Sequence, residues 1–249
     1  ALWWERWAGA RWTDTIVCVS AAEYLRGRSA RISATYQVAR NGIDVEAVTA
    51  VAVGGRENLR ASLNLAATDR VAVCVGRLTR QKGQDVLLAA WPMVRGIPGK
   101  RLVLVGDGPD ATDLHAQADG DDAVKFVGGV DRTTALAWLS AADIVVVPSR
   151  WEGMALVPLE ALAAGTPVVA SDVTGVAEAV VEPVGTVVPP DDAKALAAAL
   201  NRWLALAPQE AAEVRAHARE WAQAEFSLDI TVAAVESALR DTLQRRQLR

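Results

Sequence analysis

The stretch IVVVPSRWEGMALVPLEALAAG, residues 144–165, contains the features that decide the fold of this chain. Its first four residues form a continuous β-branched run, typical of a parallel strand that is buried on both faces. Apolar residues then recur at helical spacing over residues 157–164, with Pro158 suited to a first helical turn and Gly165 to a helix end. The stretch therefore predicts a strand, a loop that carries Glu152, and a helix that carries Glu160.

The same alternation extends through most of the chain. We expect strands at residues 71–75, 102–105, 124–127, 144–147, 168–170 and 186–188, and helices at residues 83–94, 109–118, 133–139, 157–164 and 175–181. Such alternation implies right-handed βαβ crossovers, and it predicts an α/β fold with a Rossmann-like parallel sheet and helices on both faces. From residue 191 onward the period is helical, with Asp191 or Asp192 able to cap a first helix and Pro208 able to start a second.

The loop around Glu152 suits a phosphorylated ligand. Open parallel sheets bind ligands at the carboxyl ends of their strands, and the free amides of a helix start attract anions. The carboxylates of Glu152 and Glu160 would repel phosphates, but they could accept hydrogen bonds from hydroxyl groups on either side of them. A ligand in which sugar hydroxyls flank a diphosphate is a nucleotide sugar.

Two basic residues, Arg77 and Lys82, follow the first strand of the expected sheet and lie at the same edge. A guanidinium fork and an ammonium group suit two phosphates, and each charge-assisted hydrogen bond is worth roughly 1.5–3 kcal/mol. Taken alone, the pair could equally be two exposed basic residues beside a turn.

Several segments together resemble a known family. Residues 152–160 are similar to the E-x7-E signature of retaining glycosyltransferases of the GT-B fold, above all family 4. Further segments resemble family blocks in the family's order: GRLTRQKG (76–83), VLVGDGP (103–109), FVGGV (126–130), ADIVVVPS (142–149) and GTPVVAS (165–171). By this resemblance we identify the chain as the C-terminal, donor-binding domain of such an enzyme together with the end of its N-terminal domain.

The resemblance implies roles for individual residues. Arg77 and Lys82 would hold the diphosphate and stabilise it as a leaving group, Glu152 would lie near the donor sugar, and Glu160 would accept hydrogen bonds from the ribose. The other donor-binding positions would be Gly76, Gly106, Val130, Gly153, Met154, Ala155 and Leu156. Ala155 stands where the family often has glycine, so the resemblance does not imply the shape of the site that holds the sugar. No cofactor and no metal are implied, because the substrate is a nucleoside-diphosphate sugar such as a UDP- or GDP-sugar.

The resemblance also implies a domain organisation. Residues 1–45 would be the end of the acceptor domain and a linker, residues 46–226 the Rossmann-like nucleotide-sugar-binding domain, and residues 227–249 a C-terminal crossover helix. We expect most of the acceptor domain, which would hold a glycan, lipid or small-molecule acceptor, to lie upstream of this chain. Family members often act on lipid-linked glycans, so a cytoplasmic enzyme with peripheral contact to the inner face of the membrane is implied.

Composition excludes other classes. A net charge of −4 and a pI near 5.3 argue against nucleic acid as a partner. No apolar run reaches the roughly 18 residues of a membrane span. Cys18 and Cys74 lie in apolar runs, which indicates buried free thiols in a reducing compartment. His115 and His217 are expected to be surface or structural residues.

The start of the chain carries four tryptophans, Trp3, Trp4, Trp7 and Trp12. We expect them to pack onto a core, with a membrane-surface anchor as the alternative. Without the upstream domain this face would be exposed, which would favour a homodimer.

Two other functions stay open at this point. A non-catalytic nucleotide-sugar-binding module would fit a naturally short chain. A nucleotide-sugar epimerase of the GT-B fold would share the fold and the donor type, but the combination of Arg77, Lys82 and E-x7-E argues against it.

Overall fold

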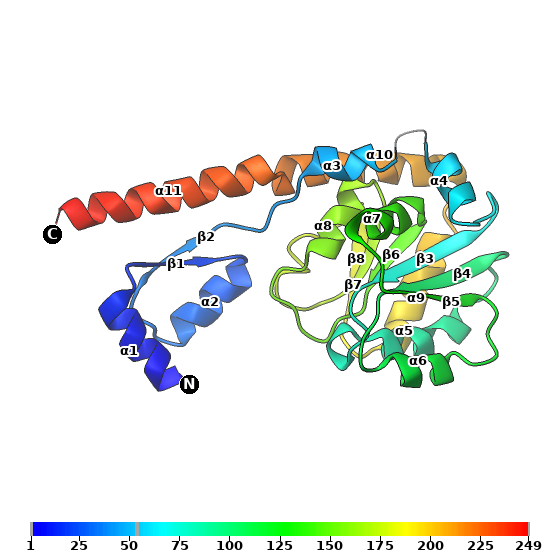
Figure 1. Cartoon of the computed structure of the whole chain (residues 1–249), viewed down its shortest axis with the longest axis horizontal. Helices are drawn as coiled ribbons and strands as arrows, with labels where there is room; N and C mark the ends of the chain where they lie inside the picture. Colours follow the sequence, from blue (N-terminus) through cyan, green and yellow to red (C-terminus); the bar gives the residue numbers. More distant parts are fainter. Residues whose placement is uncertain (1, 53–54, 249) are drawn as a thin grey trace.

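The computed structural model describes residues 2–52 and 55–248, and most of them belong to one α/β domain. Its centre is a six-stranded sheet, all parallel, in the order β5-β4-β3-β6-β7-β8 (Figure 1). The strands are β3 (Arg70–Val75), β4 (Lys100–Val105), β5 (Val124–Gly128), β6 (Ile144–Val147), β7 (Val168–Ser171) and β8 (Gly185–Val188). The chain winds outward from β3 in one direction and from β6 in the other. The carboxyl ends of β3 and β6 therefore flank a topological switch point, where such sheets bind ligands.

Helices cover both faces of this sheet (Figure 1). One face packs against α5 (Gln84–Ala90), α6 (Ala111–Gln117) and α9 (Ala193–Leu204), and the other against α7 (Arg132–Ala141), α8 (Leu156–Ala163) and α10 (Pro208–Phe226). Alternate residues of β3 enter the two cores, with Val71 and Val73 on the α8 side and Ala72 and Cys74 on the α5 side. This alternation explains why the buried strands read as unbroken apolar runs. The expected Rossmann-like fold with a helical tail is confirmed.

The helix starts that the sequence predicts near residues 191 and 208 are present in the structure. Asp192 caps α9 by accepting hydrogen bonds from the amides of Lys194 and Ala195, and Pro208 is the first residue of α10. Short 3-10 turns, η1 (Arg80–Lys82) and η2 (Trp91–Met93), flank α5. Trp91 is 1% exposed and belongs to the core.

The first part of the chain forms a smaller group at one end of the molecule (Figure 1). It comprises α1 (Leu2–Trp12), β1 (Thr15–Cys18), α2 (Ala21–Ser29) and β2 (Thr35–Val38), with β1 and β2 paired in parallel. Two short helices, α3 (Val45–Ala50) and α4 (Arg56–Ser62), lead into the large sheet. The last helix, α11 (Leu228–Gln247), runs back to this group, where the hydroxyl oxygens of Thr242 and Thr15 lie 2.6 Å apart.

Two expectations from the sequence are wrong. Residues 175–181 contain turns and no helix, and Gly175 has a left-handed φ of +78°, outside the helical range. The buried residues Val176, Ala179 and Val180 had produced the helical spacing. The tryptophans also fail to enter a core: Trp3, Trp4 and Trp12 are 75%, 55% and 65% exposed. The rings of Trp4 and Trp12 pack on each other and on Trp7.

Other expectations hold for the described residues. Cys18 and Cys74 are buried and free, and burial raises the pKa of the Cys74 thiol to about 12. His115 and His217 are exposed, with His115 stacked on Phe126. Among residues 2–52 and 55–248, no helix combines the length and the apolar character needed to cross a bilayer.

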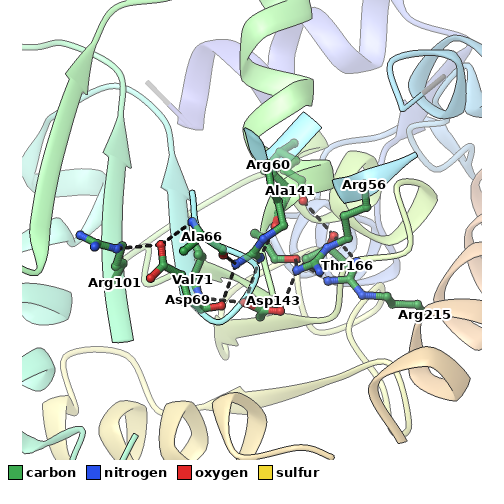
Figure 2. Close-up of polar contacts among 12 residues, drawn as sticks. Arg56, Arg60, Ala66, Asp69, Val71, Arg101, Ala141, Asp143, Thr166 and Arg215 are labelled. Atoms are coloured by element: carbon green, nitrogen blue, oxygen red, sulfur yellow. Dashed lines mark hydrogen bonds and ion pairs between the residues drawn. The ribbon is translucent and has the colours of Figure 1, made fainter. Parts of the chain in front are cut away.

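A cluster of charged residues closes the amino-terminal edge of the large sheet (Figure 2). Arg60, only 3% exposed, donates to the carbonyl oxygens of Ala66, Asp69 and Ala141 at 2.9, 2.7 and 3.0 Å. Its guanidinium also lies 3.3 Å from Asp143, whose other carboxylate oxygen pairs with Arg56 at 2.6 Å. The cluster thus ties together the segments that precede β3 and β6.

Arg215 of α10 completes this edge by donating to the carbonyl oxygen of Ala142 (Figure 2). Burial lowers the pKa of Arg215 to about 9, and repulsion from Arg56 contributes. Arg215 shares the carbonyl oxygen of Ala142 with Arg56, which donates to the same oxygen at 3.1 Å. The amino-terminal edge is therefore a structural element, far along the strands from the edge where ligands are expected.

Candidate functional site

The loops that leave the carboxyl ends of β3, β4 and β6 touch through glycines. A Cβ atom added to Gly83 would lie 2.0 Å from the carbonyl oxygen of Pro148, and one added to Gly106 would lie 2.0 Å from that of Gly76. Gly83 also has a left-handed φ of +66°, which side chains rarely adopt. The backbones therefore approach more closely than any other residue type would allow, and they gather the candidate residues at the switch point.

Lys82 and Glu152 meet across this switch point. The ammonium of Lys82 lies 2.6 Å from Oε1 of Glu152, and the hydroxyl of Ser149 donates to the same oxygen at 2.7 Å. The Glu152 side chain is 7% exposed and that of Lys82 is 28% exposed. The ammonium of Lys82 still has two N–H donors for another partner.

A small cavity of about 80 Å³ opens beside this ion pair. Its lining comes from the ends of β3 and β6 and from the first turn of α8: Cys74, Val75, Lys82, Val146, Val147, Pro148, Ser149, Glu152, Ala155, Leu156 and Val157. A water molecule occupies about 30 Å³ of liquid, so the cavity holds only a few waters. The cavity is therefore too small to enclose a nucleotide sugar, and most of such a ligand would lie outside it.

Helix α8 begins at the same place without a side-chain cap. Its N-cap residue is Ala155, which has no oxygen to accept a hydrogen bond from the first amides of the helix. Those amides and the positive end of the helix dipole make the start of α8 suited to an anion. This suits the predicted role of the amides of Gly153, Met154, Ala155 and Leu156.

Glu160 lies one turn into α8 and is 12% exposed. Its Oε1 accepts a hydrogen bond from the guanidinium of Arg132, the first residue of α7, at 3.0 Å. The two glutamates of the E-x7-E pattern therefore each have a basic partner, one from the β3 side of the site and one from the β5 side.

Other predicted residues lie around this centre without joining the ion pair. Arg77 is exposed on the loop after β3 and does not line the cavity, although its carbonyl oxygen accepts a hydrogen bond from Gln84 at 3.1 Å. Val130 packs against the core on the α8 side, and Met154 is 7% exposed. Leu156, at the start of α8, is 46% exposed and is open to a ligand.

Residues that the sequence did not single out also contribute. Ser149 lies within residues 144–165, but the sequence alone does not indicate that its hydroxyl donates to Glu152. Asn41, in the Asn-Gly turn after β2, donates to the carbonyl oxygen of Met154 at 2.9 Å. Glu23 of α2 approaches the same loop, since a Cβ atom on Gly153 would lie 3.3 Å from its Oε1. The N-terminal group therefore contacts the loop that carries Glu152.

No group of three or more His, Cys, Asp or Glu residues in the described ranges is arranged to hold a metal ion. Fold and site together define the Rossmann-like half of a GT-B fold, with an edge at its switch point whose chemistry suits an anion. Residues 55–221 match the family model described as "Glycosyl transferases group 1". The chain belongs to this family.

Individual relatives agree with this assignment. The chain is 38% identical over 219 residues to D-inositol 3-phosphate glycosyltransferase from Saccharomonospora viridis, covering 81% of this chain and 49% of the relative. It is 42% identical over 132 residues to glycogen synthase from Mycobacterium tuberculosis, covering 51% of this chain and 32% of the relative. It is also 33% identical over 227 residues to a GDP-mannose-dependent mannosyltransferase from Corynebacterium glutamicum, covering 87% and 59%. The chain thus spans about a third to three fifths of the length of these relatives.

Solved structures show the same fold. Sucrose-phosphate synthase from Thermosynechococcus elongatus is 33% identical with a TM-score of 0.77, covering 94% of this chain and 58% of that one. Anabaena Alr3699/HepE, in complex with UDP-glucose, is 25% identical with a TM-score of 0.80, covering 95% and 66%.

Proposed function

We propose that this chain is the donor-binding half of a retaining glycosyltransferase, which moves a sugar from a nucleoside-diphosphate sugar to a glycan, lipid or small-molecule acceptor. The observation that carries the proposal is the shielded Lys82–Glu152 ion pair beside the uncapped start of α8. It combines a cation and free amides for a diphosphate with carboxylates for hydroxyl groups. The names of the relatives support a sugar donor, and the Anabaena neighbour contains UDP-glucose.

In this proposal, the leaving diphosphate gains negative charge as its bond to the sugar breaks. The ammonium of Lys82 and the guanidinium of Arg77 stabilise that charge, together with the amides from Gly153 to Leu156. Because these groups are in place before the bond breaks, they need little reorganisation in the transition state. They also supply the positive charge that a metal ion supplies in other enzymes, so the proposed site works without a metal.

The two glutamates bind the ends of the donor. Glu160 accepts hydrogen bonds from the ribose hydroxyls, displacing or sharing Arg132, and Glu152 faces the sugar while Ser149 and Lys82 hold its carboxylate. Gly76, Gly106 and Val130 line the strand ends where the base lies. The family resemblance supports action in the cytoplasm, at the inner face of the membrane where lipid-linked acceptors are found.

Calorimetric titration of the 249-residue chain with UDP, GDP, ADP, CDP and dTDP tests the proposal. We expect saturable binding of one nucleotide, lost in Glu160→Ala. Glu182→Ala is the matched control, because Glu182 also pairs with an arginine, Arg202, but on the exposed surface before β8. A folded chain that binds none of the five nucleotides, or a Glu160→Ala variant that binds as tightly as the parent, would contradict the proposal.

A further inference from the structure

Arg150, two residues before Glu152, is held more completely than the other basic residues of the site. Its guanidinium makes a two-pronged contact with the carboxylate of Asp85 at 2.8 and 2.7 Å, and its Nε donates to Asp191 at 2.7 Å. Nη1 also donates to the carbonyl oxygen of Arg80 at 2.6 Å. The Arg150 side chain is only 15% exposed.

These contacts leave Arg150 little capacity to bind a ligand. Four hydrogen bonds engage a guanidinium that has five N–H donors. Two carboxylates, Asp85 and Asp191, already balance its single charge. A basic residue at a phosphate site is ordinarily a ligand, but this one is committed to the protein.

Apart from Asp191, the partners of Arg150 belong to the segment that carries Lys82. The carbonyl oxygen of Arg80 accepts from its side chain, and that of Gln81 accepts from its backbone amide at 2.8 Å. A third link joins the same two segments, since the side-chain amide of Gln81 donates to the carbonyl oxygen of Trp151 at 3.0 Å. Turn η1, which ends at Lys82, is therefore bonded to the loop that carries Glu152.

Lys82 has a long flexible side chain, and an ion pair at its far end does not fix the backbone that carries it. Its backbone position must come from the links on either side of it. Arg150 supplies two of these links, to Arg80 and to Asp85, and they connect points two and three residues from Lys82 with a point two residues from Glu152. Loss of the guanidinium would remove these links and leave those made by Gln81, so η1 would be held less firmly against the loop.

We propose that Arg150 is a positioning residue, which holds Lys82 against Glu152 so that the Lys82 ammonium meets the diphosphate of a nucleoside-diphosphate ligand. This inference rests on the proposed function for the identity of the ligand. The link between Arg150 and Lys82 is a property of the chain alone, and it can be measured without any ligand.

The ligand-free measurement is NMR of the side-chain ammonium groups. The chain has four lysines, Lys82, Lys100, Lys125 and Lys194, so the Lys82 signal can be assigned with the Lys82→Arg variant. In the parent chain we expect a separate Lys82 signal with slow proton exchange, because the ammonium is held by Glu152. In Arg150→Lys this signal should move to the position and exchange rate of an exposed lysine such as Lys194.

The binding measurement is a double-mutant cycle. With the nucleotide that the titration identifies, Arg150→Lys should weaken binding about tenfold, as expected when a charge-assisted contact is misplaced. In a Lys82→Ala background it should weaken binding little further, because residues that act through one another are not additive. Asp85→Asn, which keeps the guanidinium but removes its two-pronged partner, should reproduce part of the loss.

Arg202→Lys is the matched control, since Arg202 also bonds both oxygens of one carboxylate, that of Glu182, at 2.7 and 3.2 Å. It should change neither the Lys82 signal nor nucleotide binding. An unchanged Lys82 signal in Arg150→Lys, or a loss of affinity of equal size with and without Lys82, would overturn the inference. A chain that binds no nucleotide but shows the change in the Lys82 signal would reject the proposed function and retain the Arg150–Lys82 coupling.

Discussion

Gly175 lies directly against Gly153, so closely that a Cβ atom on Gly175 would be 1.9 Å from the carbonyl oxygen of Gly153. The turn after β7 therefore packs against the loop that carries Glu152. Its left-handed φ of +78° adds a second reason for glycine at this position.

Gly175→Ala should therefore displace the Gly153 loop and weaken nucleotide binding, with a destabilisation of about 1–3 kcal/mol. Calorimetric titration and urea unfolding measure the two effects. Gly120→Ala is the control for backbone strain alone, because Gly120 has a φ of +81° but no atom within 4 Å of its Cβ position. Equal loss of nucleotide binding in both variants would contradict the supporting role of Gly175.

Lys82→Ala should weaken binding of a nucleoside diphosphate roughly 10- to 100-fold, the effect of losing a charge-assisted hydrogen bond. The corresponding nucleoside, which has no phosphate, should bind the variant and the parent equally. Titration with both ligands separates a phosphate contact from a general disturbance of the site. Lys194→Ala, at an exposed position near the start of α9, is the control.

Nucleotide binding should not change when divalent cations are removed with EDTA, because Arg77, Lys82 and the amides at the start of α8 supply the positive charge. Titrations with EDTA and with added Mg²⁺ or Mn²⁺ check this. A marked strengthening of binding by either cation would show that the proposed charge balance is incomplete.

Asp85 should make stability depend on acid pH. Hydrogen bonds from Arg150 lower the pKa of Asp85 below its ordinary value of 3.8. A carboxyl group of this kind stabilises the folded chain above the unfolded pKa, and the contribution is lost as the pH falls through the folded pKa. The free energy of unfolding should therefore fall less steeply below about pH 4 in Asp85→Asn than in the parent. Since Asp85 is about half exposed, the difference between the two proteins should be modest. The same dependence of the free energy of unfolding on pH in both proteins would contradict this prediction.

Arg60→Met should destabilise the chain by about 3–5 kcal/mol, because it removes one partner of a buried charged network and leaves carbonyl oxygens unpaired. Arg101→Met, in contrast, removes a guanidinium that is half exposed and should cost about 1 kcal/mol or less. Urea unfolding compares the two. Below its unfolding transition, Arg60→Met should bind nucleotide like the parent, since the cluster lies at the opposite edge of the sheet.

The fold was predictable because its signals are local. Apolar runs of strand length, helical spacing and glycines at the ends of elements all follow from neighbours in the sequence, and β6 and α8 appear where residues 144–165 indicated them. Local signals also explain the failure at residues 175–181, where buried residues in turns imitate a helix. The exposure of Trp3 and Trp12 depends on what surrounds α1, which spacing does not reveal.

The site was predictable only in part. Glycines and charged residues after strands placed Lys82, Glu152 and Glu160 at one edge, because parallel strands end together. The pairing of Lys82 with Glu152 requires β3 to lie beside β6, although 68 residues (76–143) separate the two strands in the sequence. The bonds of Arg150 to Asp85 and Asp191 span 65 and 41 residues, a relationship that a single sequence does not indicate.

The charged cluster of Arg60, Asp143 and Arg215 has a consequence for how this domain can change over time. The cluster holds the starts of β3 and β6 in place, so the loops at the carboxyl ends of the strands contribute less to the stability of the sheet. Those loops can accept substitutions that alter which base or sugar they fit while the domain still folds. A library of variants restricted to residues 107, 109, 110 and 129–131, which keeps the closely packed Gly106 and Gly108, should therefore retain mostly folded members, and selection from it offers a route to altered donor preference.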